Sequence, residues 1–331
     1  MMDASIQPDV TFVIAAYNSA DCIVPAIESA LAQQSVTLEV IVVDDCSADT
    51  TRDVVGTIAE RDPRVRLIAL ETNLGPGGAR NAGIDAATGR WIAVLDSDDV
   101  IRPDRTARMI ARAEQMSAQI AVDNLDVVYT DGRPTETMFE EAFLQQRGTL
   151  TLEDFIASNI LFRSTFNFGY MKPMFERAFL AANDLRFHST LRIGEDYLLL
   201  ASALAVGGIC TIEPTSGYVY NIREGSISRV LELRHVDAMI AADAEFLARY
   251  PLSPVARMAQ TQRSRSLIEA RHFLMLVSGI KRRSLPDVLK IAVRDPVALR
   301  HLRMPIEVRL RKLRDTIFTP SVQTDVKRQA S

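Results

Sequence analysis

Residues 91–99 read WIAVLDSDD, an apolar run that passes directly into three carboxylates at Asp96, Asp98 and Asp99. A short apolar run bounded by a turn signal predicts a buried strand, so the acids follow the point where that strand leaves the sheet. Ligands of open α/β sheets bind at the carboxyl ends of the strands. Neighbouring carboxylates repel one another, and a hard divalent cation such as Mg²⁺ or Mn²⁺, which prefers oxygen ligands, would offset that repulsion. The alternative is a solvated turn that caps the following helix.

The sequence that precedes this stretch alternates between strand and helix patterns. Strands are expected at 9–16 (core VTFVIAA), 38–43 (LEVIVV) and 65–70 (VRLIAL), and helices at about 20–33, from 47–51 onward and, after the loop ETNLGPGG, at about 79–87. The strands are nearly continuous apolar runs, as expected of strands buried on both faces. This alternation predicts an α/β domain with a doubly wound, mainly parallel sheet flanked by helices.

Beyond the acidic stretch the pattern continues and then loosens. A helix is expected at 103–116, a strand at 120–129, and short helices and loops at 139–184. The longest uncharged segment, 197–212, is interpreted as a buried helix followed by a short strand, because it is shorter than the roughly 20 apolar residues that span a bilayer. A polar segment is expected at 218–228, and from about residue 231 the chain is expected to be helical and increasingly basic.

The composition is that of an ordinary globular protein, with 47% hydrophobic and 24% charged residues. Three cysteines without metal-ligand spacing support neither a disulfide framework nor a zinc site, which favours the reducing cytoplasm. No secretory signal is expected, because the opening residues MMDASIQPD are polar. From Pro254 onward there are 17 Lys and Arg against 6 Asp and Glu, whereas residues 1–253 carry 21 against 36. A basic end on an acidic body predicts a negatively charged partner.

Polar groups also follow the other predicted strands. Asp44 and Asp45 end the second strand, where a carboxylate can accept hydrogen bonds from a ribose or a base N–H; alternatively they cap the next helix. The glycines of NLGPGG resemble a phosphate-binding loop, but they do not match G-x-G-x-x-G at the first strand–helix turn, so a dinucleotide fold is not supported. Arg80 is expected in the first turn of its helix, where its guanidinium can pair with phosphate. A surface salt bridge is the alternative.

The segments VIAAYNSADCI, EVIVVDDCSADTT and NLGPGGARNAGIDAATGRWIAVLDSDD together resemble the successive motifs of family 2 glycosyltransferases. The match is dense over residues 10–130 and thins out to about residue 230. Within this family, the sequence resembles the bacterial enzymes that assemble exopolysaccharides, such as the succinoglycan-type glucosyltransferases. The resemblance implies a GT-A fold and a hexosyltransferase that uses a UDP-sugar.

The resemblance also assigns roles by position. Asp96 and Asp98 match the D-x-D pair, in which Asp98 is expected to hold Mg²⁺ or Mn²⁺ and Asp96, which faces the ribose, is included in the metal site. Asp196, in the sequence Gly194-Glu195-Asp196, is expected to be the general base. The alternative is that Glu195 and Asp196 only favour the dipole of the helix that they begin.

Further positions are expected to bind the nucleotide sugar. Arg223, with Ser226 and Ser228, resembles a segment that closes over the diphosphate, with a solvated turn as the alternative. The residues expected to bind the donor are Ala16 and Tyr17 at the nucleobase, Asp45 at the uracil ring with Asp44 close by, Arg80, Asp96 and Arg223.

The predicted function is an inverting, metal-dependent transfer of a hexose, glucose from UDP-glucose, to a saccharide hydroxyl in exopolysaccharide biosynthesis. Asp196 would take the acceptor proton, and a metal at Asp98 would neutralise charge on the departing UDP. Two other classes stay open. A nucleotidyltransferase that forms sugar nucleotides is expected to have a glycine-rich basic loop where this chain has AAYNSAD. A non-catalytic nucleotide-sugar-binding relative is the other.

The domain prediction places a catalytic domain at 1–230, with a nucleotide-binding half at about 1–130 and an acceptor half at about 131–230, and a helical basic extension at 231–331. The extension interleaves cations with apolar residues in RHFLMLVSGIKRR and IEVRLRKLR, as in amphipathic helices that lie on anionic membranes. Peripheral contact with the cytoplasmic face of the membrane, at a lipid-diphosphate-linked acceptor, is one expectation. Packing on the catalytic domain or on a second copy is the other. No nucleic-acid partner is expected.

Overall fold

The computed structural model describes residues 7–163, 166–222 and 231–302. The chain divides into two compact units, residues 1–267 and 268–331. Arg223, Ser226 and Ser228 lie outside the described residues, as does the segment IEVRLRKLR at 306–314. The domain boundary near residue 230 stays a prediction; residues 231–267 belong to the first compact unit.

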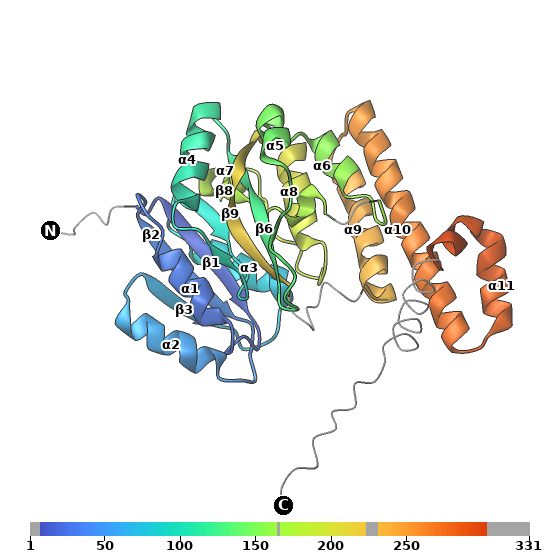
Figure 1. Ribbon diagram of the computed structural model, residues 1–331, viewed down its shortest axis with the longest axis horizontal. Coiled ribbons are helices and arrows are strands. Elements are labelled where there is room, and N and C mark those ends of the chain that lie inside the picture. Colours follow the sequence, from blue (N-terminus) through green and yellow to red (C-terminus); the bar gives the residue numbers. More distant parts are fainter. Residues whose placement is uncertain (1–6, 164–165, 223–230, 303–331) are drawn as a thin grey trace, which may run out of the picture. The chain divides into compact units, whose positions relative to one another are not determined.

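The first unit is built on one mixed sheet (Figure 1). Its described strands are β1 (Val10–Ala16), β2 (Leu38–Asp44), β3 (Val65–Ala69), β4 (Trp91–Val94), β5 (Val100–Ile101), β6 (Ile120–Tyr129), β7 (Glu136–Thr137), β8 (Met174–Glu176) and β9 (Cys210–Ile222). The order across the sheet is β3-β2-β1-β4-β8-β6-β9-β5, and β7 pairs with β6. The strands β3, β2, β1 and β4 run parallel, as do β6 and β9, whereas β8 is antiparallel to both of its neighbours. The predicted doubly wound, mainly parallel sheet is confirmed.

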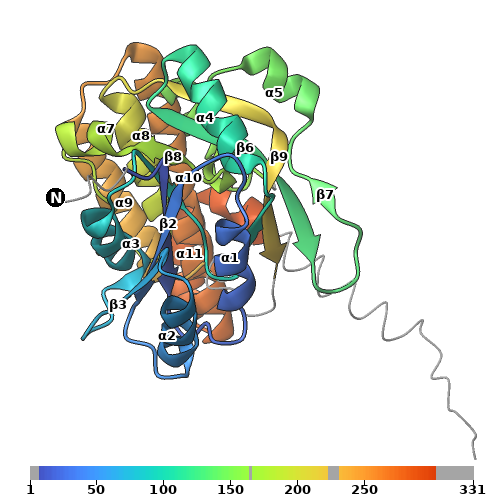
Figure 2. The same cartoon turned by 90° about the vertical axis from the view of Figure 1, so that its left-hand side faces the viewer.

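Helices flank this sheet. The described helices are α1 (Ile23–Leu31), α2 (Thr51–Arg61), α3 (Gly75–Ala86), α4 (Arg105–Met116), α5 (Glu141–Arg147), α6 (Leu152–Ser158), α7 (Arg177–Ala182), α8 (Glu195–Ala205), α9 (Leu233–Arg249), α10 (Pro254–Lys281) and α11 (Leu285–Arg294), with the 3₁₀ helices η1 (Phe168–Tyr170) and η3 (Pro296–Leu302). The helix α3 packs on β1 and β2, and α4 packs on β6 and β9. Figure 2 shows α1 and α3 on opposite sides of the parallel strands. The helical C-terminal region that the sequence predicts is present.

The strand order places a topological switch point beside β1. The chain moves outward from β1 to β2 and β3, and then returns to the other side of β1 with β4. The crevice of such sheets opens where the order reverses, at the carboxyl ends of the two strands that flank the reversal. The sheet is firmly anchored there, because six of the seven residues of β1 are buried. The switch point therefore lies where WIAVL meets the three acids.

Two boundaries differ from the sequence-based expectation. The expected loop ETNLGPGG does not extend to residue 78, because α3 begins at Gly75. Pro76 fits the first helical turn, where its missing N–H needs no partner. A Cβ on Gly77 would lie 2.6 Å from the backbone oxygen of His188, so this glycine permits close packing. The short strand expected at the end of the uncharged segment 197–212 is also longer than predicted, since β9 begins at Cys210 and continues to Ile222.

Two helical glycines allow a matched test of this close packing. A Cβ at Gly83 in α3 would lie 2.4 Å from Cγ1 of Val13 in β1, whereas a Cβ at Gly56 in α2 would meet nothing within 4 Å. We expect Gly83→Ala to lower the free energy of unfolding by about 1–3 kcal/mol through overpacking. We expect Gly56→Ala to raise it by about 0.5–1 kcal/mol, because alanine restricts the unfolded chain and favours the helix. Urea denaturation of both variants measures the difference, and equal effects would contradict the packing argument.

Candidate active site

The carboxyl ends of β1, β2 and β4 lie side by side, because these strands are adjacent and parallel. Ala16 at the end of β1 pairs in register with Asp44 at the end of β2. Ala16, Asp44 and Asp45 are buried, whereas Tyr17, which directly follows β1, is 50% exposed. The residues that the sequence assigns to the nucleobase therefore share one edge with the first acidic pair.

Asp45 fixes the beginning of α3. Its carboxylate accepts hydrogen bonds from the backbone N–H groups of Leu74 at 2.6 Å and Gly75 at 2.8 Å. The N-cap residue Leu74 has no side-chain cap to offer, so Asp45 satisfies two donors that a helix N-terminus otherwise leaves open. Burial raises the pKa of the Asp45 carboxyl, more than the two backbone hydrogen bonds lower it.

Asp44 holds the loop between β2 and α2. Its Oδ2 pairs with Arg52 at 3.2 Å and accepts a hydrogen bond from the backbone N–H of Ser47 at 3.3 Å. The other oxygen, Oδ1, is buried and has no hydrogen-bond partner among the described residues. Asp44 is therefore a buried residue that fixes the backbone at this edge of the site through its contacts with Ser47 and Arg52.

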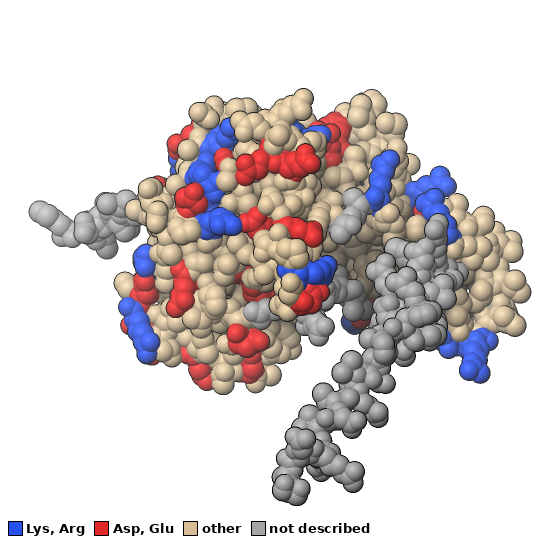
Figure 3. Space-filling view, in the orientation of Figure 1, with Lys and Arg blue, Asp and Glu red and all other residues tan. Residues whose placement is uncertain are grey.

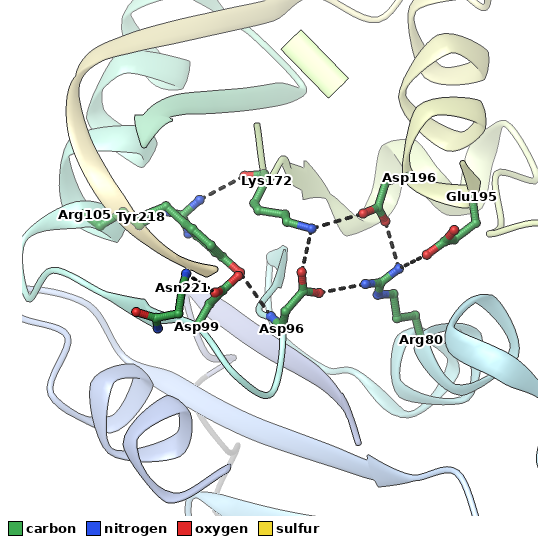
Figure 4. A network of polar contacts seen from close by, with 9 residues as sticks. All are labelled: Arg80, Asp96, Asp99, Arg105, Lys172, Glu195, Asp196, Tyr218 and Asn221. Atoms are coloured by element: carbon green, nitrogen blue, oxygen red, sulfur yellow. Dashed lines mark hydrogen bonds and ion pairs between the residues drawn. The ribbon is translucent and has the colours of Figure 1, made fainter. Parts of the chain in front are cut away.

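Arg80 lies at the centre of a buried ion network (Figure 4). Its Nη1 is 2.8 Å from both Glu195 Oε1 and Asp196 Oδ1, and its Nη2 is 2.7 Å from Asp96 Oδ1. Its side chain is only 7% exposed, so the alternative of a surface salt bridge does not describe it. The planar fork of arginine suits this task, since it presents several N–H donors in fixed directions. The guanidinium of Arg80 thus joins residues 96–99, called the D-x-D loop below, to the start of α8.

Lys172 closes the network, and sequence reasoning missed it. Its Nζ lies 2.6 Å from Asp96 Oδ2 and 3.1 Å from Asp196 Oδ2. Lys172 comes two residues before β8, the short antiparallel strand inserted beside β4. A single lysine carries no motif, and its place in the network follows from the pairing of β8 with β4, which the structure shows and the sequence pattern does not.

The opposite charges in this network offset the effect of burial on the pKa values of Arg80, Lys172 and Asp96. Burial alone would lower the pKa of Arg80, but the carboxylates of Asp196, Asp96 and Glu195 raise it above its ordinary value. Burial would likewise lower the pKa of Lys172, which Asp196 and Asp96 raise. The pKa of Asp96 falls below its ordinary range, because Lys172 and Arg80 outweigh the effect of burial. Asp96 is therefore held as a carboxylate.

The rest of the D-x-D loop is bound to the end of β9. Tyr218 donates its hydroxyl to Asp99 Oδ2 at 2.9 Å and accepts the backbone N–H of Asp96 at 3.2 Å (Figure 4). Asn221 donates its backbone N–H to Asp99 Oδ1 and its side-chain amide to the backbone oxygen of Asp98, both at 2.8 Å. Burial, with the charges of Asp96 and Asp98, raises the pKa of Asp99 well above its ordinary value. The loop is fixed from two sides.

The carboxylates of this loop limit how a metal ion can bind. Among the described residues, no group of three or more His, Cys, Asp and Glu side chains is placed to hold a metal ion by itself. Both oxygens of Asp96 pair with cations, and both oxygens of Asp99 accept hydrogen bonds from β9. Asp98 is partly exposed. This donor set fits an ion such as Mg²⁺, which binds through one or two carboxylates and completes its shell with substrate phosphates and water.

The start of α8 is supported from the helix that follows the sheet. Gly194 precedes it with φ of +90°, a left-handed conformation that favours glycine. Behind Asp196, the ring of Tyr197 lies under the guanidinium of Arg263 in α10, 3.5 Å from its centroid, and the tyrosine hydroxyl donates to Gln260 Oε1 at 3.3 Å. Residues 260–263 belong to the same compact unit as the sheet. The carboxylate of Asp196 is therefore positioned through α10 as well as through Arg80.

The comparisons with known proteins identify the class. A sequence model of Glycosyl transferase family 2 matches residues 11–179, which include β1 except for Val10, the strands β2 to β4, the D-x-D loop, Arg80 and Lys172. The chain belongs to this family and is a glycosyltransferase.

Individual relatives agree with the family. The chain is 65% identical over 314 residues to the succinoglycan biosynthesis protein ExoO of Rhizobium meliloti (strain 1021), a match that covers 95% of this chain and 89% of that protein. It is 34% identical over 283 residues to ExoU of the same organism, also called a succinoglycan biosynthesis protein, with 83% and 81% covered.

Solved structures share the fold. The structure of S. aureus TarS 1-349 in complex with UDP-GlcNAc matches with a TM-score of 0.60 at 19% identity, over 87% of this chain and 92% of that one. The mannosyltransferase PcManGT from Pyrobaculum calidifontis, in complex with GDP-Man and Mn²⁺, matches with a TM-score of 0.58 at 18% identity, over 90% and 82%. The predicted GT-A fold is confirmed.

The buried network predicts a large effect of removing its arginine. We expect Arg80→Met to lower the free energy of unfolding by about 3–5 kcal/mol, because three carboxylates lose their shared partner in a buried site. A matched control is Arg64→Met, which removes the pair with Asp62 at 2.7 Å from the surface and should change stability by less than about 1 kcal/mol. Urea denaturation measures both. Similar losses in the two variants would show that the network does not hold the fold together.

Proposed function

We propose that this glycosyltransferase moves a hexose, glucose from UDP-glucose, to a hydroxyl of a saccharide acceptor with inversion at the anomeric carbon, during the synthesis of an exopolysaccharide. The observation that supports it most is the network of Arg80, Lys172, Asp96 and Asp196, which places the D-x-D loop beside one further carboxylate at the switch point of the sheet. The names of two of its relatives, both succinoglycan biosynthesis proteins, support the synthesis of an exopolysaccharide.

The donor site of this proposal is the edge formed by β1, β2 and β4. Ala16 and Tyr17 contact the nucleobase, with Asp45 and Asp44 at the uracil ring, and Asp96 faces the ribose. The half-exposed ring of Tyr17 offers an apolar surface for a base. Arg80 binds close to the nucleotide through the carboxylate of Asp96, and Arg223 contributes from the segment after β9. Complexes of structural neighbours with UDP-GlcNAc and GDP-Man support nucleotide sugars as the class of donor.

Asp196 is the proposed general base. Its carboxylate takes the proton of the acceptor hydroxyl as that oxygen attacks the anomeric carbon from the face opposite UDP. Arg80 Nη1 holds Oδ1 at 2.8 Å, and Lys172 holds Oδ2 at the longer distance of 3.1 Å. Each carboxylate oxygen can accept more than one hydrogen bond, and the Asp196 side chain is 23% exposed, so the acceptor hydroxyl can reach the base beside these two contacts.

Asp98, together with the donor diphosphate, would hold Mg²⁺ or Mn²⁺, and Asp96 supports it from the same loop. A metal ion bound there supplies Lewis-acid stabilisation of the charge that develops on the departing UDP. The residues of β9 keep the loop in place for this purpose, because Asn221 fixes the backbone of Asp98 at 2.8 Å. The Mn²⁺ complex of PcManGT supports a metal in this fold.

The proposed acceptor is an oligosaccharide linked to a lipid diphosphate. Such a molecule is held at a membrane, which places the enzyme on its cytoplasmic face. The excess of Lys and Arg from Pro254 onward supports this position, since positive side chains are attracted to the negative charge of an anionic membrane surface.

Donor binding tests the first half of this proposal. We expect purified protein to bind UDP-glucose in preference to UDP-galactose and UDP-N-acetylglucosamine in calorimetry, with an affinity that rises on addition of Mn²⁺ and falls with a chelator. Asp98→Ala should lose at least about tenfold in affinity, or 1.4 kcal/mol, because the ion loses its carboxylate. Asp85→Ala, which removes an exposed acid paired with Arg186, is the control. Full metal-dependent affinity in Asp98→Ala would reject the metal assignment, and preference for another nucleotide sugar would reject glucose.

The rate of transfer tests the base. We expect Asp196→Asn to lower kcat by about 10²–10⁴-fold while donor affinity changes little, because the proton acceptor is lost and the donor contacts remain. The comparison is Glu195→Gln, which removes the neighbouring carboxylate on Arg80 Nη1 and should retain much more of kcat. An equal fall in both variants would assign the effect to the ion network and not to a base.

A further inference from the structure

The second compact unit exposes an apolar stripe on α11. Leu285, Leu289 and Val293 are 74%, 64% and 83% exposed. They recur at every fourth residue, so they lie on one face of the helix. The helix is packed by other residues, since Ile291 is buried with Leu276 of α10 and Val288 packs against them. The stripe is therefore not needed for the small core of this unit.

Exposed cations accompany the stripe. They are Lys281, Arg282, Arg283, Lys290 and Arg294. Residues 268–302 contain seven Lys and Arg and three Asp and Glu. Two of those acids are engaged within the unit, Asp295 with His272 at 2.7 Å and Glu269 with Arg300 at 2.8 Å. Figure 3 shows a tan surface with blue Lys and Arg side chains beside it at the place where Figure 1 draws α11.

We propose that α11 is a membrane-docking helix that lies in the plane of an anionic lipid surface, with Leu285, Leu289 and Val293 inserted at the acyl boundary and the cations at the lipid phosphates. An apolar stripe alone would fit many partners. The positive charge favours an anionic membrane over the other partners, because interfacial helices on anionic lipids combine large apolar side chains with an excess of Lys and Arg. Within the described part of the chain, no helix combines the length and the apolar character that crossing a bilayer demands.

The size of the surface sets the strength of the contact. Three apolar side chains on a helix of ten residues give shallow, reversible insertion, and each cation near the surface strengthens partitioning by about fivefold at moderate salt. The attraction is screened by salt, because the Debye length shrinks from about 10 Å at 0.1 M to about 3 Å at 1 M. This inference concerns a surface apart from the donor site, and its test uses no sugar nucleotide.

Vesicle flotation of the full-length protein is the test. Vesicles of phosphatidylcholine with phosphatidylglycerol should bind the protein, and vesicles of phosphatidylcholine alone should bind it weakly. The triple variant Leu285→Gln/Leu289→Gln/Val293→Gln keeps every charge and should lower partitioning onto the anionic vesicles by at least about tenfold, since the apolar contacts are lost. The triple variant Lys281→Gln/Arg282→Gln/Arg283→Gln should lower it by about 100-fold, and high salt should do the same.

The apolar variant is the decisive one, because residues 303–331 carry further Lys and Arg, whose charge would attract anionic vesicles without any contribution from α11. Its matched control is Val255→Gln/Met258→Gln, which changes side chains 57% and 60% exposed in the first part of α10 and should leave binding unchanged. Circular dichroism should show an intact fold in all variants, as expected for exposed positions.

Two results would overturn the proposal. One is vesicle binding that is absent in the wild type or unchanged in the apolar variant. The other is self-association that light scattering detects in the wild type and that the apolar variant abolishes, which would assign the stripe to a second copy of the chain. The Asp196→Asn variant should still bind vesicles, so a failure of the proposed base would leave the membrane result intact. The apolar variant should still transfer sugar to a soluble acceptor, so a failure of the membrane proposal would leave the proposed activity intact.

Discussion

The guanidinium of Arg80 is shared by three carboxylates, and this buried contact constrains the rest of the site. Asp96 follows the end of β4, only 16 residues from Arg80. Glu195 and Asp196 begin α8 and lie 115 and 116 residues from Arg80 in the sequence. The fork can satisfy them together only if α3, β4 and α8 keep fixed positions. Asp45 secures the first of these, because its two backbone hydrogen bonds set where α3 begins. The position of Asp196, the proposed base, therefore depends on α3, whose start depends in turn on the residue that follows β2.

Stability alone does not explain why such a network is kept. Burying ions demands their desolvation, and well-packed apolar side chains often stabilise a core as well or better. Here the two cations and three carboxylates meet where the sheet opens, and Lys172 bridges the carboxylates of Asp96 and Asp196 directly. We therefore interpret the network as an arrangement that fixes the spacing between the D-x-D loop and Asp196, the proposed base. A hydrophobic replacement would lose that spacing.

The sequence predicted what is local to the parallel strands. The runs VTFVIAA and WIAVL are buried on both faces, so their position and the acids at the end of β4 follow from the apolar pattern alone. The partners of those acids do not follow from it. Tyr218 lies 122 residues from the backbone N–H of Asp96 that it binds, and Lys172 reaches Asp96 only because the antiparallel strand β8 is inserted beside β4. The start of α3 was missed for a similar reason, since its cap comes from Asp45 and not from a neighbouring residue.

The helix α10 shows why the basic C-terminal part of the chain cannot be treated as one appendage. Arg263 packs on Tyr197 and donates to the backbone oxygen of Asn159 at 2.9 Å, and both contacts lie within the compact unit that carries the sheet. Deleting everything beyond Ser253 would remove this support behind Asp196, so activity would fall whether or not the tail binds lipid. Substitutions confined to the exposed face of α11 therefore separate the proposed membrane contact from catalysis, because Leu285, Leu289 and Val293 belong to the second compact unit and are exposed.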